Sequence, residues 1–240
     1  VVLALTETME QLRIRHTLRL AAFTGVAASN INGCTLHNML KRKGDNDKNP
    51  GKPNDAIKTT LLDVDTFFID EVSMLDCQLM QHLNADLNRV HPYVYPLGHE
   101  SNIPRPDIYF GGKTMIFAGD FRQLTPVGGI PLFVKNLKKP DYAFGYFAFR
   151  QVSSYGELKN QYRIPAGEYR DVVANFREGH ISPKTLAYLE HRRIHDGNTM
   201  ATGTMKEALK DPIIITTTNE ARYAFNVAKV AQVAAILKEK

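Results

Sequence analysis

Apolar and polar positions along the chain follow two different periods. Apolar residues recur every three or four positions over 5–12 and 75–87, a spacing that predicts amphipathic helices. Short continuous apolar runs at 18–23, 66–69 and 113–118 predict buried strands. Because strands and helices alternate, we expect an α/β protein with a largely parallel sheet.

The rest of the chain adds loops and a further group of elements. Residues 41–58 and 91–107 carry charges, glycines or prolines without a period, which predicts surface loops. Apolar residues at helical spacing over 169–176 and the Ser-Pro pair at 182–183 predict two helices. An apolar run at 213–217 predicts a strand, and a long helix is expected to follow it.

Length and composition narrow the class of protein. With 240 residues, 43% of them hydrophobic and 23% charged, the chain is neither fibrous nor disordered and is long enough for about one and a half domains. No apolar run approaches the ~18 residues of a membrane span, so we expect no membrane partner. Cys34 and Cys77 lie outside any Cys-x-x-Cys pair, which argues against a disulfide framework or a structural zinc site. The net charge of +5 permits a polyanionic partner without requiring one.

Two carboxylates end one of the predicted buried strands. Residues 67–71 read Phe-Phe-Ile-Asp-Glu, which places Asp70 and Glu71 at the carboxyl edge of the sheet, where open α/β sheets bind ligands. There Asp70 can hold a Mg²⁺ ion that bridges phosphate oxygens, and Glu71 can polarise an attacking water. Taken alone, the pair is at least as well explained as an acidic opening of a loop.

A second acidic strand end follows about fifty residues later. Residues 117–127 read Phe-Ala-Gly-Asp-Phe-Arg-Gln-Leu-Thr-Pro-Val, so the strand leads into Asp120, and Gln123 follows. A neutral amide at this point can touch a γ-phosphate or its attacking water without titrating. A strand with a proline-terminated turn fits any α/β protein, but the length of the string favours a nucleotide site.

Four segments together resemble helicase motifs Ia, Ib, II and III of the petite-integration-frequency family of DNA helicases. In order, they are residues 23–28, 35–37, 70–74 and 119–127. That family is the RecD-like, 5′→3′ branch of helicase superfamily one and includes the helicase portion of Helitron transposons. The similarity continues through residues 158–179, which resemble motif IV and its following helix, and extends over residues 23–226 in all.

The resemblance implies a RecA-like P-loop NTPase fold, with a parallel sheet flanked by helices and the start of a second RecA-like domain. We expect the first domain over residues 1–150 and part of the second over 151–240. No G-x-x-x-x-G-K-[ST] phosphate loop occurs in the chain, which begins at Val1 without Met. We therefore expect a fragment that starts just after the phosphate loop. Without the amides and lysine of that loop, the fragment alone should be inactive.

The resemblance also assigns roles at the nucleotide. Glu71, Gln123 and Arg163 would be catalytic, Asp70 would hold the metal ion, and Asp120 would join these four in binding ATP. Arg163, from the second domain, would reach across the cleft as arginine fingers do. Without the flanking pattern, it is better explained as a surface arginine on a loop.

Three further residues would contact DNA. Thr24 and Gly25 follow a predicted strand, where a hydroxyl, exposed backbone N–H groups and a missing side chain suit phosphate oxygens. His37 resembles the histidine of motif Ib. Without the resemblance, a simple strand-to-helix turn explains the first two about equally well, and a histidine at the edge of the core is the more common explanation for the third.

The function that the resemblance implies is an ATP-dependent DNA helicase that moves 5′→3′. Its cofactors would be ATP and Mg²⁺, its partners single-stranded DNA and DNA duplex junctions, and it would act as a monomer. The resemblance implies a nuclear or mitochondrial location and roles in DNA repair, recombination and telomere maintenance. Two alternatives stay open: a non-catalytic nucleic-acid-binding relic of a transposon helicase, and a P-loop ATPase that remodels proteins or phosphorylates nucleotides.

Overall fold

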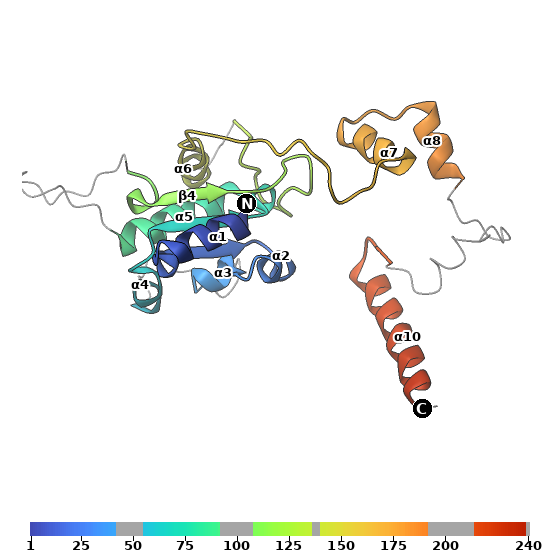
Figure 1. The fold of residues 1–240 in the computed structure, drawn as a ribbon, viewed down its shortest axis with the longest axis horizontal. Coiled ribbons are helices and arrows are strands. Elements are labelled where there is room, and N and C mark those ends of the chain that lie inside the picture. The colour runs from blue at the N-terminus through green and yellow to red at the C-terminus, as the bar shows by residue number, and fades with distance from the viewer. Residues whose placement is uncertain (42–54, 92–107, 136–139, 192–213, 239–240) are drawn as a thin grey trace, which may run out of the picture. The chain divides into compact units, whose positions relative to one another are not determined.

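The computed structural model describes residues 1–41, 55–91, 108–135, 140–191 and 214–238 (Figure 1). Contacts divide the chain into two units, 1–160 and 161–240, and each is described by itself. The assignment of residues 1–150 and 151–240 to two RecA-like domains stays a prediction.

A four-stranded parallel sheet lies at the centre of the first unit. Its strands are β1 (Leu18–Ala22), β2 (Cys34–Thr35), β3 (Thr66–Asp70) and β4 (Thr114–Phe117), and they are arranged in the order β2-β1-β3-β4. All three neighbouring pairs are parallel. The expected α/β class with a parallel sheet is confirmed, and so are the three strands that the apolar runs predicted.

Helices cover both faces of this sheet. They are α1 (Val2–Gln11), α2 (Gly25–Asn30), α3 (Leu36–Met39), α4 (Asp55–Leu61), α5 (Cys77–Val90) and α6 (Pro140–Phe149), with short 3₁₀ turns η1 (Arg15–Thr17), η2 (Val72–Met74) and η3 (Phe110–Gly112). Three of these helices are preceded by a residue whose side-chain oxygen accepts the backbone N–H three positions further along, which satisfies one of the helix's unpaired donors. These caps are Thr24, Thr35 and Asp76.

The register of the strands builds a separate core on each face. Leu20, Phe68 and Ile116 stand opposite one another on neighbouring strands and pack in the cluster that includes α1. Phe67 and Ile69 point to the other face, into the larger cluster under α3, α4, α5 and α6. Successive strand residues alternate between the faces, so strands buried on both sides appear in the sequence as continuous apolar runs.

Helices α5 and α6 pack unusually close together at one glycine. Gly145, in the middle of α6, is buried, and a Cβ atom added there would collide with the carbonyl oxygen of Cys77 at the start of α5. The absence of a side chain at Gly145 therefore sets the distance between the two helices. This contact connects the aromatic segment near residue 150 to the core of the first unit.

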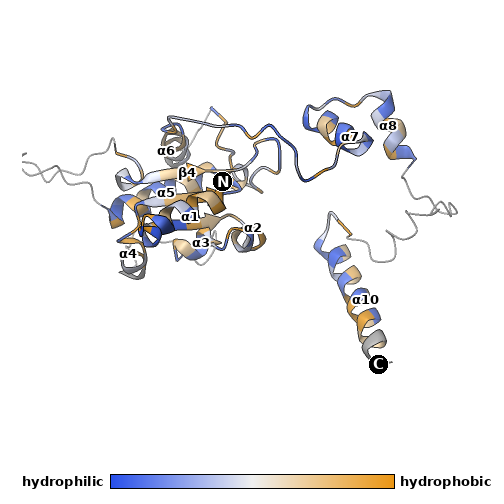
Figure 2. Cartoon of the chain, in the orientation of Figure 1, coloured by the Kyte–Doolittle hydropathy of each residue, from blue (hydrophilic) through white to orange (hydrophobic). Residues whose placement is uncertain are grey.

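The second unit contains α7 (Glu168–Arg177), α8 (Pro183–Glu190) and α10 (Asn219–Lys238), which confirms the three helices expected there. Ser182 caps α8 by accepting the Thr185 N–H at 3.2 Å. The Asn175 amide donates to the Thr185 hydroxyl at 3.0 Å and joins α7 to α8. Hydrophobic and hydrophilic residues are mixed along α10 (Figure 2). In the described part of the chain, no helix is both long and apolar enough to cross a bilayer.

Two predictions from the sequence pattern are wrong. The loop expected over 41–58 ends earlier, because Ile57 and Leu61 are one helical turn apart and bury their side chains as part of α4. The strand expected over 213–217 is absent from its described residues, 214–217, where Ile215 is exposed. A strand needs a neighbour for its backbone groups, and the described part of the second unit contains no other strand. Residues 42–54 and 92–107 of the expected loops lie outside the described residues.

The close approach at Gly145 predicts a large loss of stability in Gly145→Ala. Alanine normally favours a helix over glycine by about 1 kcal/mol, but here the new methyl group must push α5 and α6 apart. We expect the free energy of unfolding to fall by about 2 kcal/mol or more, measured by urea denaturation. In the matched control Gly156→Ala, the added Cβ meets no atom within 4 Å, and a change within about 0.5 kcal/mol is expected. Equal stabilities of the two variants would contradict this packing.

Candidate functional site

The carboxyl ends of β3 and β4 are joined beyond the last strand residues. β3 ends at Asp70 and β4 ends at Phe117. The Ala118 N–H donates to the Ile69 carbonyl oxygen at 2.8 Å, and the Val72 N–H donates to the Ala118 carbonyl oxygen at 2.9 Å. These two bonds hold the residues that follow each strand beside those that follow the other.

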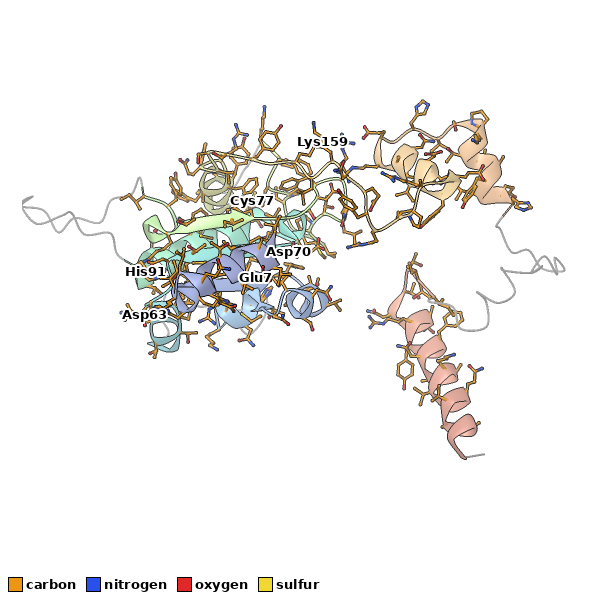
Figure 3. All side chains as sticks on the ribbon, viewed as in Figure 1. Glu7, Asp63, Asp70, Cys77, His91 and Lys159 are labelled. Carbon is orange, nitrogen blue, oxygen red and sulfur yellow. The ribbon has the colours of Figure 1, made fainter. Side chains whose placement is uncertain are left out.

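Figure 3 labels residues from both edges of the sheet. Asp70 ends β3, whereas Asp63 precedes this strand and His91 follows the last turn of α5. The labels of Asp63 and His91 lie toward one side of the sheet and that of Asp70 toward the other. Asp70 therefore lies at the carboxyl edge of the sheet.

Asp70 is half-buried, and its carboxylate is oriented by its own neighbour. Its Oδ1 atom accepts the Glu71 backbone N–H at 3.0 Å, and the carboxylate retains its second oxygen for a cation. No group of three or more potential metal ligands lies together among the described residues. Mg²⁺ commonly uses only one or two protein carboxylates and completes its shell with water and phosphate oxygens. The donor set around Asp70 therefore fits Mg²⁺ bound together with a nucleotide.

Glu71 has a left-handed backbone, with φ 56° and ψ 44°. This conformation is uncommon for a residue with a side chain, and it is often found at functional sites. The Glu71 carbonyl oxygen accepts the Met74 N–H at 3.1 Å, and the next two residues, Val72 and Ser73, are buried. The 3₁₀ turn η2 thus fixes the backbone on one side of Glu71, and the end of β3 fixes it on the other.

Asp120 organises the turn that contains Gln123. Its Oδ1 accepts the Arg122 N–H at 3.0 Å, and its carbonyl oxygen accepts the Gln123 N–H at 2.9 Å. The Gln123 side-chain amide donates to Asp120 Oδ2 at 3.4 Å. Gln123 is exposed, so its amide stands at the surface with its position set by Asp120.

The three candidate DNA contacts follow β1 and β2 at the same edge. Ala22, the last residue of β1, pairs with both Thr35 and Asp70. Directly after Ala22 and Phe23, Thr24 accepts the Ala27 N–H at 3.2 Å through its hydroxyl and caps α2. This is the strand-to-helix turn that the sequence allowed as the simpler explanation.

Gly25 and His37 differ in their surroundings. A Cβ atom added to Gly25 would meet nothing within 4 Å, so packing does not require glycine there. His37 lies on α3, half-buried, with its ring edge against Phe23 at 6.1 Å between centroids and 67° between planes. Its aromatic contact agrees with a histidine at the edge of the core, and it stands beside the Thr24 turn.

Arg163 belongs to the second unit. It is exposed in an irregular stretch, and its backbone N–H donates a hydrogen bond to Gln161 Oε1 at 2.9 Å. The structure does not place it relative to Asp70. Its role at a nucleotide therefore stays a prediction.

The sequence did not predict how the segment after β4 is attached at its far end, residues 130–131. Asp76 caps α5 by accepting the Leu79 N–H at 2.7 Å, and it forms an isolated antiparallel bridge with Pro131. The Cys77 N–H donates to the Ile130 carbonyl oxygen at 2.9 Å. An acidic residue before a helix is a recognisable cap signal, but nothing in the sequence indicates the pairing with residues 130–131.

The start of α1 also lies at the carboxyl edge. α1 leads through η1 into the beginning of β1, so the helix runs back along the sheet and its first residues come near the strand ends. Val2 packs in the same cluster as Ala118. A helix N-terminus presents unpaired N–H groups and a partial positive charge, both of which favour anions.

These features describe a parallel α/β sheet with acidic residues after two neighbouring strands, and the comparisons identify the family. The profile of the PIF1-like helicase family matches residues 3–132, which is more than half of the chain. The chain therefore belongs to the PIF1-like helicase family.

Curated relatives match over part of their length. The chain is 33% identical over 122 residues to the ATP-dependent DNA helicase PIF1 of Saccharomyces cerevisiae, covering 49% of this chain and 13% of the relative. It is 32% identical over 177 residues to that of Candida albicans, covering 68% of this chain and 18% of the relative. The chain thus spans less than a fifth of the length of either relative.

Solved structures confirm the fold. The Pif1 helicase of Bacteroides in complex with ADP-AlF3 and single-stranded DNA matches with a TM-score of 0.62 and 22% identity, over 90% of this chain and 47% of that one. The Candida albicans Pif1 helicase matches with a TM-score of 0.63 and 24% identity, over 95% of this chain and 47% of that one. The expected RecA-like fold is confirmed.

The buried thiol of Cys77 gives a test of the packing beside this edge. Burial, together with the negative charge of Asp76, raises the pKa of Cys77 from 9.0 to about 11. A thiolate forms only as the pH approaches the pKa, so at pH 8 only about one Cys77 in a thousand is reactive. In a Cys34→Ser variant, we expect iodoacetamide at pH 8 to modify Cys77 at least about 100-fold more slowly in the folded chain than in urea, measured by mass spectrometry. Similar rates in both conditions would contradict the burial.

Proposed function

We propose that this chain is part of an ATP-dependent DNA helicase that couples ATP hydrolysis to 5′→3′ movement along single-stranded DNA. The observation that carries the proposal is the joining of two acidic strand ends, Asp70-Glu71 and Asp120 with Gln123, at one edge of a parallel sheet in a PIF1-like chain. Open parallel sheets bind nucleotides at this edge.

Each residue has a proposed task in hydrolysis. Asp70 would hold Mg²⁺, which would offset phosphate charge. Glu71 orients and deprotonates the attacking water. The amide of Gln123 contacts the γ-phosphate or that water, with Asp120 beside it, and Arg163 from the second unit stabilises the charge that spreads in the transition state.

The DNA contacts are proposed for the neighbouring turns. Thr24, Gly25 and His37 would contact the backbone of a single strand. The space around Gly25 supports this, because the fold itself does not require glycine there and a bare backbone lets a phosphate approach its N–H groups.

The partners and the cellular role are also part of the proposal. Relatives are described in complex with single-stranded DNA and, for two coordinating Pif1 helicases, at forked double-stranded DNA. We propose single strands and duplex junctions as substrates, with the monomer as the acting form and paired action at forks as its alternative. The family resemblance supports a nuclear or mitochondrial location and a part in DNA repair, recombination or telomere maintenance.

A non-catalytic relic is the second candidate, because the 240 residues contain no phosphate loop. The two candidates differ in what the encoding gene specifies before Val1. An in-frame phosphate loop there supports the enzyme, and a stop codon supports the relic. A protein-remodelling ATPase or a nucleotide kinase would instead hydrolyse ATP without stimulation by single-stranded DNA.

The 240-residue chain by itself is expected to hydrolyse no ATP. Asp70 and Glu71 would face the phosphate charges without the loop's amides and lysine. The measurement is phosphate release with Mg²⁺-ATP, with and without single-stranded DNA. Robust turnover by the purified chain would refute the assignment of roles at this edge.

In a longer protein that carries the phosphate loop, Glu71→Gln is expected to lower kcat by about 100-fold or more while ATP binding is retained. The change keeps the size of the side chain and removes the base. Turnover comes from steady-state ATPase assays, and binding comes from a fluorescent ATP analogue. Glu7→Gln makes the same change of charge at an exposed position on α1 and should leave both values unaltered. Undiminished turnover in the Glu71 variant would remove the role given to this residue.

A further inference from the structure

The backbone of Gly119 lies directly against the residue that follows Glu71. Gly119 has φ 149°, and a Cβ atom added there would stand 2.8 Å from the backbone nitrogen of Val72, 3.1 Å from Val72 Cγ1 and 3.4 Å from the carbonyl carbon of Glu71. The first distance is shorter than side-chain carbons tolerate. The missing side chain of Gly119 therefore sets how near the two strand ends approach each other.

Val72 cannot move away without disturbing Glu71. Its N–H is bonded to the Ala118 carbonyl oxygen at 2.9 Å, and its side chain is buried among the core residues under α5. Glu71 itself holds a left-handed conformation between Asp70 and Val72. A shift of the Val72 nitrogen would consequently change the direction of the Glu71 carboxylate.

The next residue, Asp120, controls Gln123 in the same way. Its side chain and its carbonyl oxygen together accept the N–H groups of Arg122 and Gln123 and the side-chain amide of Gln123. The Gly119-Asp120 pair thus touches the surroundings of Glu71 on one side and Gln123 on the other.

We propose that Gly119 and Asp120 are positioning residues that fix Glu71 and Gln123 relative to each other for the hydrolytic step. This inference rests on the proposed function. It gives Asp120 a task different from the nucleotide contact that the sequence resemblance implies, because its carboxylate faces the Gln123 turn. Misplacing a catalytic group by about 1 Å can lower a rate about 100-fold, so the effect should appear in kcat while ATP binding is maintained.

The first experiment compares two glycines of the same segment in a longer protein that carries a phosphate loop. Gly119→Ala places a Cβ against Val72, whereas Gly128, with φ 73°, has open space around it. Both variants acquire backbone strain, but only the first has the clash. We expect Gly119→Ala to lower kcat at least tenfold with the KM for ATP within about threefold, and Gly128→Ala to stay within about threefold for both.

The second experiment asks whether Asp120 positions Gln123 or binds the metal ion or the nucleotide. It also tests the proposed positioning role if Gly119→Ala does not fold. Asp120→Ala should lower kcat at least tenfold without changing the Mg²⁺ concentration required for half-maximal activity. Asp120→Asn keeps an oxygen acceptor for the turn and should recover most of kcat. A raised Mg²⁺ requirement, or equal losses in both variants, would show that the carboxylate charge acts on the metal or the nucleotide, and it would overturn the positioning role.

The third experiment uses the 240-residue chain and needs no ATP. Amide hydrogen exchange at Val72 should be at least tenfold faster in Gly119→Ala than in the wild type and unchanged in Gly128→Ala. Equal exchange in all three would overturn the contact. A longer wild-type protein that hydrolyses no ATP would instead refute the proposed function, and the exchange result would still decide whether Gly119 holds Val72 in place.

Discussion

The candidate site depends on the parallel pairing of β3 with β4, and above all on its continuation past the ends of both strands. Two backbone hydrogen bonds, Ala118 to Ile69 and Val72 to Ala118, extend the pairing where the chain turns away from the sheet. Parallel strands place their carboxyl ends on the same edge, so an acidic residue after each strand meets its counterpart. The core beneath this pair, centred on Phe67 and Ile69, keeps both strands in register.

The parts of the fold that the sequence predicted are those whose signal is contained in one segment. Buried strands gave continuous apolar runs and α5 gave helical spacing, because burial on one or both faces determines which positions are apolar. The spacing in α7 and α10 also predicted helices, although few of their described side chains are buried. The start of α4 was missed because neighbouring prolines and charges outweighed the pair Ile57 and Leu61. The strand expected at 213–217 failed because an apolar run does not reveal whether a partner strand is available.

The features of the candidate site also divide into those that the sequence predicts and those that it does not. Asp70, Glu71, Asp120 and Gln123 could be predicted to lie at one edge, since topology alone brings parallel strand ends together. The contact of Gly119 with Val72 and the attachment of residues 130–131 to the start of α5 could not be predicted, because they depend on backbone conformation and on packing between distant segments.

The attachment of the segment after β4 at both ends has a mechanical consequence. Ala118 is hydrogen-bonded to Val72, and Ile130 is hydrogen-bonded to Cys77. The two ends of the segment are therefore attached within one stretch of six residues, which ends at the start of α5. Between them Phe121 packs against Phe133 and Phe149, whereas Val127 is 99% exposed. A displacement of residues 72–77 would therefore be transmitted to both ends of the segment that carries Gln123.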